Sequence, residues 1–253
     1  MARPRTTLTV QRTEWLTPHL IRVHFGGPGL AAFRPSEFSD SYVKFIFERD
    51  EIEVLRTYTV RSIDTAAGEL AIDFVYHGDE GIAGPWAAAA KPGDVIDVYG
   101  PGGAYSPRPD ADWHLLAGDE AALPAISAAL EAMPSTAVGR VFVEVAGPDD
   151  ELPLTKPDGV ELTWLHRGDR GPGELLAETV RSAPWSAGQV QVFIHGEAHA
   201  VMHDLRRYIR RDREVPAEWA NSISGYWRRG RTEEGFRAWK AELKAAESAP
   251  AAG

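Results

Sequence analysis

Cysteine is absent from this chain of 253 residues. Disulfides, iron–sulfur clusters and thiolate zinc sites are therefore excluded, and a reducing compartment fits the composition better than an oxidising one. Basic residues are few, since 27 Lys and Arg against 37 Asp and Glu give a formal net charge of -10. Because nucleic-acid binding needs a net basic face, we expect no nucleic acid as a partner.

Long apolar runs are absent as well. No stretch approaches the roughly 18 apolar residues of a membrane-spanning helix, and the N-terminus lacks the apolar run of a signal peptide. The sequence therefore predicts a cytoplasmic protein with no membrane insertion. Hydrophobic residues still make up 43% of the chain, enough for a substantial core, and the length suits two domains of ordinary size.

The first hundred residues predict short strands separated by turns, with one Ala-rich helix over 82–90. The expected strands are 7–12, 20–25, 42–48, 56–61, 69–76 and 94–99. Six strands with so little helix predict a small antiparallel β-barrel, with the helix capping one open end.

The pattern changes after a stretch rich in Pro and Gly at 101–109, which predicts an N-terminal domain over 1–108 and a C-terminal domain over 109–253. Expected strands at 113–118, 141–145, 161–165 and 190–194 alternate with helices at 120–132, 173–182 and 197–212. Continuous apolar strands separated by helices indicate an α/β domain whose parallel sheet is covered on both faces. A further amphipathic helix is expected over 232–246.

The strand segment Arg56-Thr57-Tyr58-Thr59 carries the first candidate site. Side chains alternate along a strand, so Arg56 and Tyr58 share a face. The Arg offers a cation for phosphate, the Tyr a flat ring for stacking, and Thr59 a hydroxyl or backbone N–H for the edge of a ring system. An ordinary half-exposed strand has a similar composition, so the motif alone decides little.

A glycine-rich turn follows about twenty residues later, from His77 to Gly84. Gly78, Gly81 and Gly84 let backbone N–H groups approach phosphate closely, and the helix start adds a positive dipole end. A plain turn with a small cap helix is the alternative. Both motifs in this order, ahead of an α/β domain, favour a flavin dinucleotide.

Several residues that follow strands of the second domain are candidate ligands, because open α/β sheets bind ligands at the carboxyl ends of their strands. Asp119 and Glu120 follow the first strand, and Asp119 is expected to cap a helix. Arg167 follows the third strand; it either binds a 2′-phosphate, which favours NADPH, or is a solvated surface residue. Glu197 follows the fourth strand.

The chain resembles the siderophore-interacting protein family, a branch of the ferredoxin–NADP reductase-like flavoproteins. The resemblance covers about residues 20 to 230. Its matching blocks are 56–61 (RTYTVR), 73–81 (DFVYHGDEG), 91–94 (KPGD), 100–103 (GPGG), 118–126 (GDEAALPAI) and 224–230 (SGYWRRG).

This resemblance implies an FAD-binding barrel, a domain that binds NADPH or NADH, and reduction of ferric siderophores with release of Fe(II). Flavin can join a two-electron donor to a one-electron acceptor, so no catalytic side chain and no metal site is expected. Family members usually carry a Ser on the pyrophosphate where this chain has Gly84, which predicts weaker FAD binding. The implied cofactor-binding residues are Arg56, Thr57, Tyr58, Thr59, Val75, His77, Gly78, Gly81, Ile82, Ala83, Gly84, Asp119, Glu120, Arg167, Glu197, Tyr226 and Trp227, and the substrate-facing residues are Lys44 and Arg228.

Three other functions stay open at this point: electron transfer to a ferredoxin-like or flavodoxin partner, a non-catalytic siderophore-binding module that releases iron, and a reductase of free flavin. Two further clusters are read as ordinary surface. His195, His199 and His203 recur at spacings of four without a zinc motif. Eight arginines between 206 and 231 could attract an anionic chelate or dinucleotide phosphates, but most are expected to be solvated: Arg206, Arg207, Arg210, Arg211, Arg213, Arg228, Arg229 and Arg231.

Overall fold

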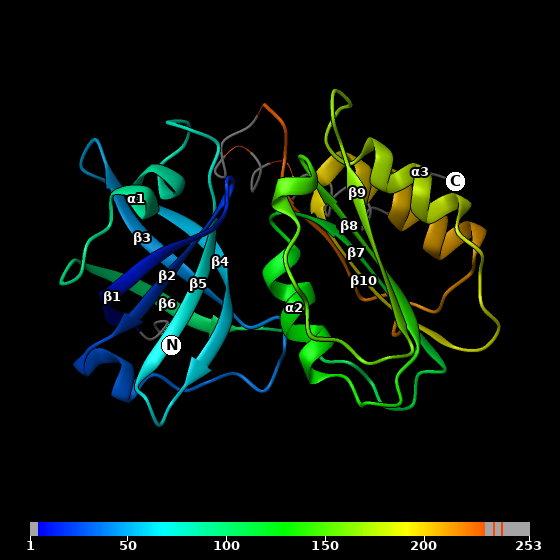
Figure 1. The fold of residues 1–253 in the computed structure, drawn as a ribbon, viewed down its shortest axis with the longest axis horizontal. Coiled ribbons are helices and arrows are strands. Elements are labelled where there is room, and N and C mark those ends of the chain that lie inside the picture. Colours follow the sequence, from blue (N-terminus) through cyan, green and yellow to red (C-terminus); the bar gives the residue numbers. More distant parts are fainter. Residues whose placement is uncertain (1–4, 231–234, 236–238, 240–253) are drawn as a thin grey trace, which may run out of the picture.

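The computed structural model describes residues 5–230 together with Gly235 and Trp239, and it contains a barrel and an open sheet placed side by side (Figure 1). The barrel strands are β1 (Arg5–Thr17), β2 (Leu20–Gly26), β3 (Tyr42–Arg49), β4 (Ile52–Asp64), β5 (Glu69–Val75) and β6 (Val95–Gly102). They close in the order β1-β2-β5-β4-β3-β6, and every pairing is antiparallel. The predicted barrel is confirmed.

Aromatic side chains fill the barrel and fix its cap. Phe25, Phe45 and Phe74 are fully buried on its inner face. The ring of Trp86, from helix α1 (Ala83–Ala89), lies 5.7 Å from Phe74 and 6.2 Å from Phe25 and Phe45. This contact holds α1 over one end of the barrel, as the sequence predicts. A short 3₁₀ turn, η1 (Pro28–Ala32), joins β2 to the segment before β3.

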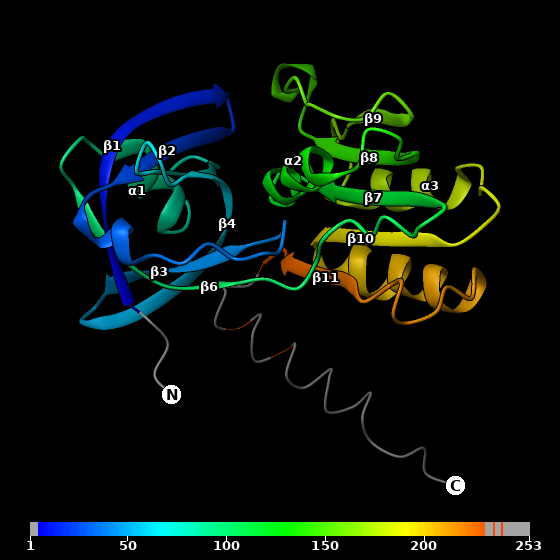
Figure 2. The same cartoon turned by 90° about the horizontal axis from the view of Figure 1, so that it is seen from below.

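The second unit is a five-stranded parallel sheet in the order β11-β10-β7-β8-β9 (Figure 2). Its strands are β7 (Trp113–Asp119), β8 (Gly139–Val145), β9 (Val160–His166), β10 (Val190–Glu197) and β11 (Ser222–Trp227). Helix α2 (Leu123–Ala132) packs on one face. Helix α3 (Glu174–Ser182) and the helical stretch made of η3 (His199–Leu205) and η4 (Tyr208–Asp212) cover the other, and η2 (Pro148–Asp150) is a short turn after β8. The predicted α/β domain is confirmed.

Some elements differ from the sequence-based expectation. Strand β11 was not predicted, because Gly225 interrupts a run of only six residues. Helix α2 begins at Leu123 rather than at 120, since residues 119–122 form a turn and Pro124 suits a first helical turn. The stretch 199–212 is helical as predicted, but most of it is π-helix. The helix expected over 232–246 lies outside the described residues except for Gly235 and Trp239.

Helix α2 faces the barrel, so the ends of β4 and β5 meet the sheet domain there (Figure 1). The Arg61 guanidinium on β4 contacts the Glu131 carboxylate on α2 at 2.5 and 3.0 Å. Across the same seam, the His19 Nδ1 lies 2.9 Å from an Asp150 oxygen. The predicted domain boundary after residue 108 falls in segment 103–112, which joins β6 to β7.

Candidate functional site

Arg56 and Tyr58 share one face of β4, and that face points into the barrel. Their cross-strand partners on β3 are the buried Phe45 and Val43. The Tyr58 ring lies 4.4 Å from the Phe74 ring and 5.9 Å from the Phe45 ring. Both motif side chains remain partly exposed, so this end of the barrel presents a cation beside an aromatic ring.

Thr57 and Thr59 occupy the opposite face of β4. Thr57 is exposed and pairs with Lys44 on β3, while Thr59 is buried and pairs with Tyr42. The substrate candidate Lys44 therefore lies on the other face of the barrel wall from Arg56 and Tyr58.

The turn after β5 presents open backbone. Gly78 and Gly81 have φ values of 74° and 83°, and nothing lies within 4 Å of a Cβ added at either position. Only glycine adopts such conformations without strain, and the empty space leaves their backbone open to a ligand. Helix α1 has only seven residues, so its dipole contributes less to phosphate binding than expected from the sequence. A hollow of about 480 Å³ adjoins the turn, with Ile82, Trp86 and Phe47 in its wall.

Gly84 has a packing role that was not inferred from sequence. A Cβ there would lie 3.0 Å from the Val75 carbonyl oxygen and 3.6 Å from the Tyr76 Cα, so the glycine lets α1 pack closely on β5. The close contact offers packing as a second explanation of Gly84, and unlike the missing hydroxyl it predicts no loss of FAD affinity.

We expect Gly84→Ser to lower the free energy of unfolding by about 1 kcal/mol, because the strand must shift to admit a side chain. It should not tighten FAD binding. Urea unfolding and FAD titration measure the two effects, with Ala88→Ser, at an exposed position of α1, as the matched control. An FAD affinity that rises in Gly84→Ser alone would restore the hydroxyl explanation.

Asp119 joins three neighbouring strand ends of the sheet. Its carboxylate accepts hydrogen bonds from the backbone N–H of Ala121 at 3.0 Å, from that of Glu197 at 2.8 Å, and from the Trp227 indole Nε1 at 2.8 Å. A Cβ on Gly196 would lie 2.7 Å from the same carboxylate, so β10 admits Asp119 only because residue 196 is glycine. Asp119 is thus a buried clasp, not the expected cap of α2.

Burial is the main influence on the Asp119 carboxyl. Removal from water, reinforced by the negative charge of neighbouring Glu120, raises its pKa to about 7, although the three N–H donors act in the opposite direction. The clasp therefore changes charge near neutral pH.

Arg167 is neither a solvated residue nor an open cation. Its guanidinium contacts Glu120 at 2.7 and 3.3 Å and Glu144 at 3.2 Å, and the side chain is 15% exposed. Glu144 also accepts the backbone N–H groups of Gly173 and Leu176 at 2.8 and 3.0 Å. Sequence reasoning missed Glu144, although a charged residue inside the apolar run 141–145 was a usable signal.

The seam brings the barrel turn and the strand ends together. His77 is half-buried, which lowers its pKa, and Glu120 and Arg167 act on its charge from across the seam. Burial raises the pKa of Tyr226 on β11, and the negative charges of Asp40, Asp119 and Tyr42 act in the same direction. Residues predicted from separate motifs thus converge at one place.

The other candidates lie apart from one another. Arg228 stacks on Trp239 at 4.1 Å, and its buried Nη1 has no hydrogen-bond partner among the described residues. His195 lies on β10 and contacts Ser222, whereas the His199 and His203 rings face each other at 5.2 Å on the following helix. Within the described ranges, no group of three or more His, Asp or Glu residues could hold a metal ion.

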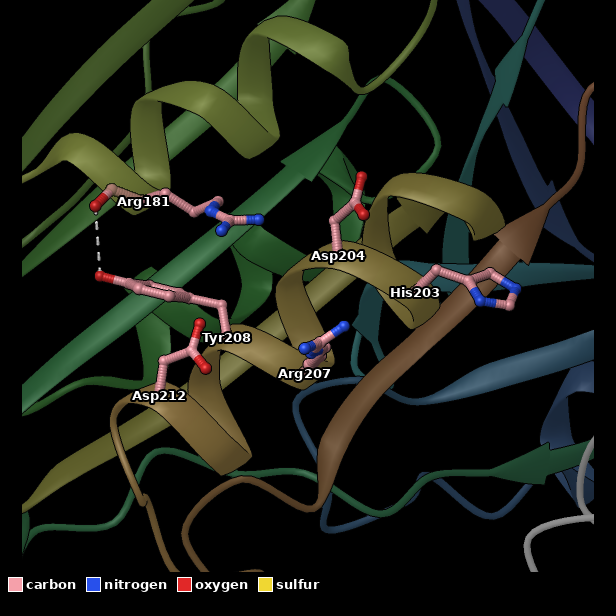
Figure 3. Close-up of a pocket in the computed structure, with 6 residues that line it drawn as sticks. All are labelled: Arg181, His203, Asp204, Arg207, Tyr208 and Asp212. Atoms are coloured by element: carbon pink, nitrogen blue, oxygen red, sulfur yellow. Dashed lines mark hydrogen bonds between the residues drawn. The ribbon is translucent and has the colours of Figure 1, made fainter.

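Most of the basic cluster lies at the surface, as expected from the sequence: Arg207, Arg210, Arg211 and Arg213 are exposed. Arg206 and Arg210 donate to the carbonyl oxygens of Ile223 and Ala220, and Arg213 lies over the Trp185 ring. Arg207 lines a polar pocket of about 220 Å³ on the sheet face opposite α2 (Figure 3). None of the predicted cofactor-binding residues lines that pocket, whose walls are Arg181, His203, Asp204, Arg207, Tyr208 and Asp212.

A barrel with a glycine turn, joined to a parallel sheet across such a seam, is the fold of ferredoxin reductase-like structures. The family model described as siderophore-interacting protein matches residues 111–230, and the siderophore-interacting FAD-binding domain matches 9–55 and 47–105. The chain belongs to the siderophore-interacting protein family.

Three similar proteins cover almost the whole chain. An uncharacterized protein of Mycobacterium tuberculosis is 53% identical over 97% of this chain and 98% of its own. The ferric vibriobactin reductase ViuB of Vibrio cholerae is 33% identical over 89% and 90%. The crystal structure of the siderophore-interacting protein SipS from Aeromonas hydrophila is 32% identical, with a TM-score of 0.83 over 96% and 99%.

Among the described residues, no helix is long and apolar enough to cross a membrane. The cytoplasmic location expected from the sequence stays a prediction.

Proposed function

We propose that this chain is an FAD-dependent oxidoreductase that uses NAD(P)H to reduce ferric siderophores and release Fe(II) in the cytoplasm. The observation that carries the proposal is the seam itself, where the charges of Glu120 and Arg167, at the carboxyl ends of the sheet, act on His77 of the barrel turn. Bound FAD accepts two electrons as hydride and gives them up singly, which suits it to join a nicotinamide to ferric iron. The ferric reductase named ViuB supports the same reaction class.

The residues present fit FAD. Arg56 offers a cation for the pyrophosphate. The positive-φ glycines Gly78 and Gly81 leave backbone N–H groups open to the same phosphates. Tyr58 offers a ring at the same end of the barrel, with Val75, Ile82 and Ala83 as flanking contacts. Thr57 and Thr59 have their side chains on the opposite face of β4, so they would contribute backbone groups. The buried clasp at Asp119 fixes the backbone at Glu197 and the indole of Trp227, next to Tyr226.

Lys44 and Arg228 supply positive charge for an anionic chelate. The two side chains come from opposite domains, Lys44 from β3 and Arg228 from the residue after β11. An anionic ferric chelate held near both would lie across the seam. Its reduction needs no acid–base side chain, because electrons alone are transferred to the iron.

An anaerobic spectrophotometric experiment tests this function. The FAD-loaded protein is mixed with NADH or NADPH and then with a ferric hydroxamate or catecholate chelate. We expect the absorbance near 450 nm, a property of oxidised flavin, to fall on the first addition and return on the second. A protein that binds the chelate and leaves this absorbance unchanged throughout would be a binding module.

The reductase of free flavin rests on weak FAD binding through the missing hydroxyl at Gly84, which the Gly84→Ser titration tests. Electron transfer to a ferredoxin-like partner calls for a basic docking surface, and the exposed Arg207, Arg210, Arg211 and Arg213 keep this alternative open.

A further inference from the structure

The ends of β7, β8 and β9 carry one shared ion-pair cluster. Arg167 follows β9, and its backbone N–H bonds to the Val145 carbonyl at the end of β8. Its side chain extends over Glu144 on β8 to reach Glu120 after β7. The guanidinium therefore lies across three strand ends and points along the edge, toward the neighbouring carboxylates.

This arrangement neutralises the arginine completely. Two carboxylates contact one guanidinium, Glu144 is fully buried and Glu120 is 10% exposed at its side chain. The ionised form of Asp119 adds further negative charge directly beside Glu120. Burial lowers the pKa of His77 and so disfavours its charged form. The cluster of Arg167, Glu120 and Glu144 therefore carries a net negative charge.

A 2′-phosphate needs a cation with donors to spare. To bind one, Arg167 would have to release Glu120, and that carboxylate would then lie almost buried and unpaired next to a dianion. A free ribose 2′-hydroxyl, in contrast, is a donor, and a carboxylate at a strand end is its usual acceptor in open α/β sheets.

We propose that this site selects NADH over NADPH, with Glu120 as the residue that determines the specificity and Arg167 as its counter-ion. The inference rests on the proposed use of a nicotinamide dinucleotide, and it reverses the NADPH preference that Arg167 suggested from sequence alone.

The test compares the non-reducing analogues tetrahydro-NADH and tetrahydro-NADPH, titrated calorimetrically into the FAD-loaded protein. We expect the NADH analogue to bind at least about tenfold more tightly, because phosphate meets like charge. Glu120→Gln should narrow the ratio to about threefold or less, mainly by tightening the NADPH analogue. Glu178→Gln, which removes the partner of exposed Arg170, is the matched control and should leave the ratio unchanged.

A salt titration of the unaltered protein gives a second readout that requires no variant to fold. Repulsion is screened by salt, so the NADH preference should shrink as ionic strength rises. Equal binding, or tighter NADPH binding that weakens with salt, would overturn the inference while leaving the proposed function standing. Binding of neither analogue would instead contradict the nucleotide half of the proposed function, and the inference with it.

Discussion

Replacing Arg56 with alanine is expected to weaken FAD binding by about ten- to a hundredfold, the range for loss of one charge-assisted contact to phosphate. Arg56 shares the inner face of β4 with Tyr58, at the partly exposed end of the barrel. Fluorescence titration of flavin-free protein with FAD measures the change.

Arg49→Ala is the matched control, since Arg49 is an exposed arginine at the end of β3 in the same barrel. It should alter FAD affinity less than about twofold. If Arg56→Ala behaves like this control, the phosphate role of Arg56 is wrong. Tyr58→Ala is a poorer test, because the Tyr58 ring also packs on Phe74 inside the barrel.

Asp119→Ala should lower the free energy of unfolding by about 3 kcal/mol, because three N–H groups, that of Glu197 buried and the other two partly buried, lose their acceptor at once. The indole N–H resonance of Trp227 should also shift, and Trp227→Phe identifies that resonance. Urea unfolding measures the stability, with Asp110→Ala as the exposed control, which should change it by less than about 0.5 kcal/mol. A loss no larger than that of the control would remove Asp119 from its structural role.

The clasp also predicts a pH dependence. Burial raises the pKa of Asp119 to about 7, above its ordinary value of 3.8, so the folded protein holds this proton more tightly than the unfolded chain. Its contribution to stability is therefore complete below about pH 4 and is lost as pH rises toward about 7, by at most about 1.4 kcal/mol per pH unit. Asp119→Asn cannot titrate. The stability of the natural protein relative to this variant should fall between about pH 5 and pH 7, and a constant difference would contradict the shift.

Most of the fold could be predicted from local patterns of apolar and polar residues. Alternation in 20–25 and 94–99 identified barrel strands, and the apolar runs 141–145 and 190–194 identified strands of the parallel sheet. Strand β11 was not predicted from the sequence. Its pairing with β10 is a long-range contact, and a six-residue segment that contains Gly225 has no clear strand pattern of its own.

The candidate site was predictable as a set of motifs but not as a geometry. The roles of Asp119, Arg167 and Gly84 depend on contacts outside their own motifs, with Trp227, Glu144 and the Val75 carbonyl. The sequence-based predictions for these three residues were helix capping, phosphate binding and a missing hydroxyl, and each rested on neighbouring residues alone. In the structure, Asp119 instead joins three strand ends, Arg167 lies in an ion-pair cluster, and Gly84 makes a close packing contact.

The most direct measurement counts the ferrous iron formed for each nicotinamide oxidised, in the absence of oxygen and with a ferrous-specific dye. One hydride carries two electrons and each ferric ion takes one, so we expect about two Fe(II) per NADH from a ferric siderophore, and only when FAD is bound. NADH consumption without Fe(II), or the same Fe(II) yield from flavin-free protein, would contradict FAD-dependent reduction of ferric siderophores by this chain.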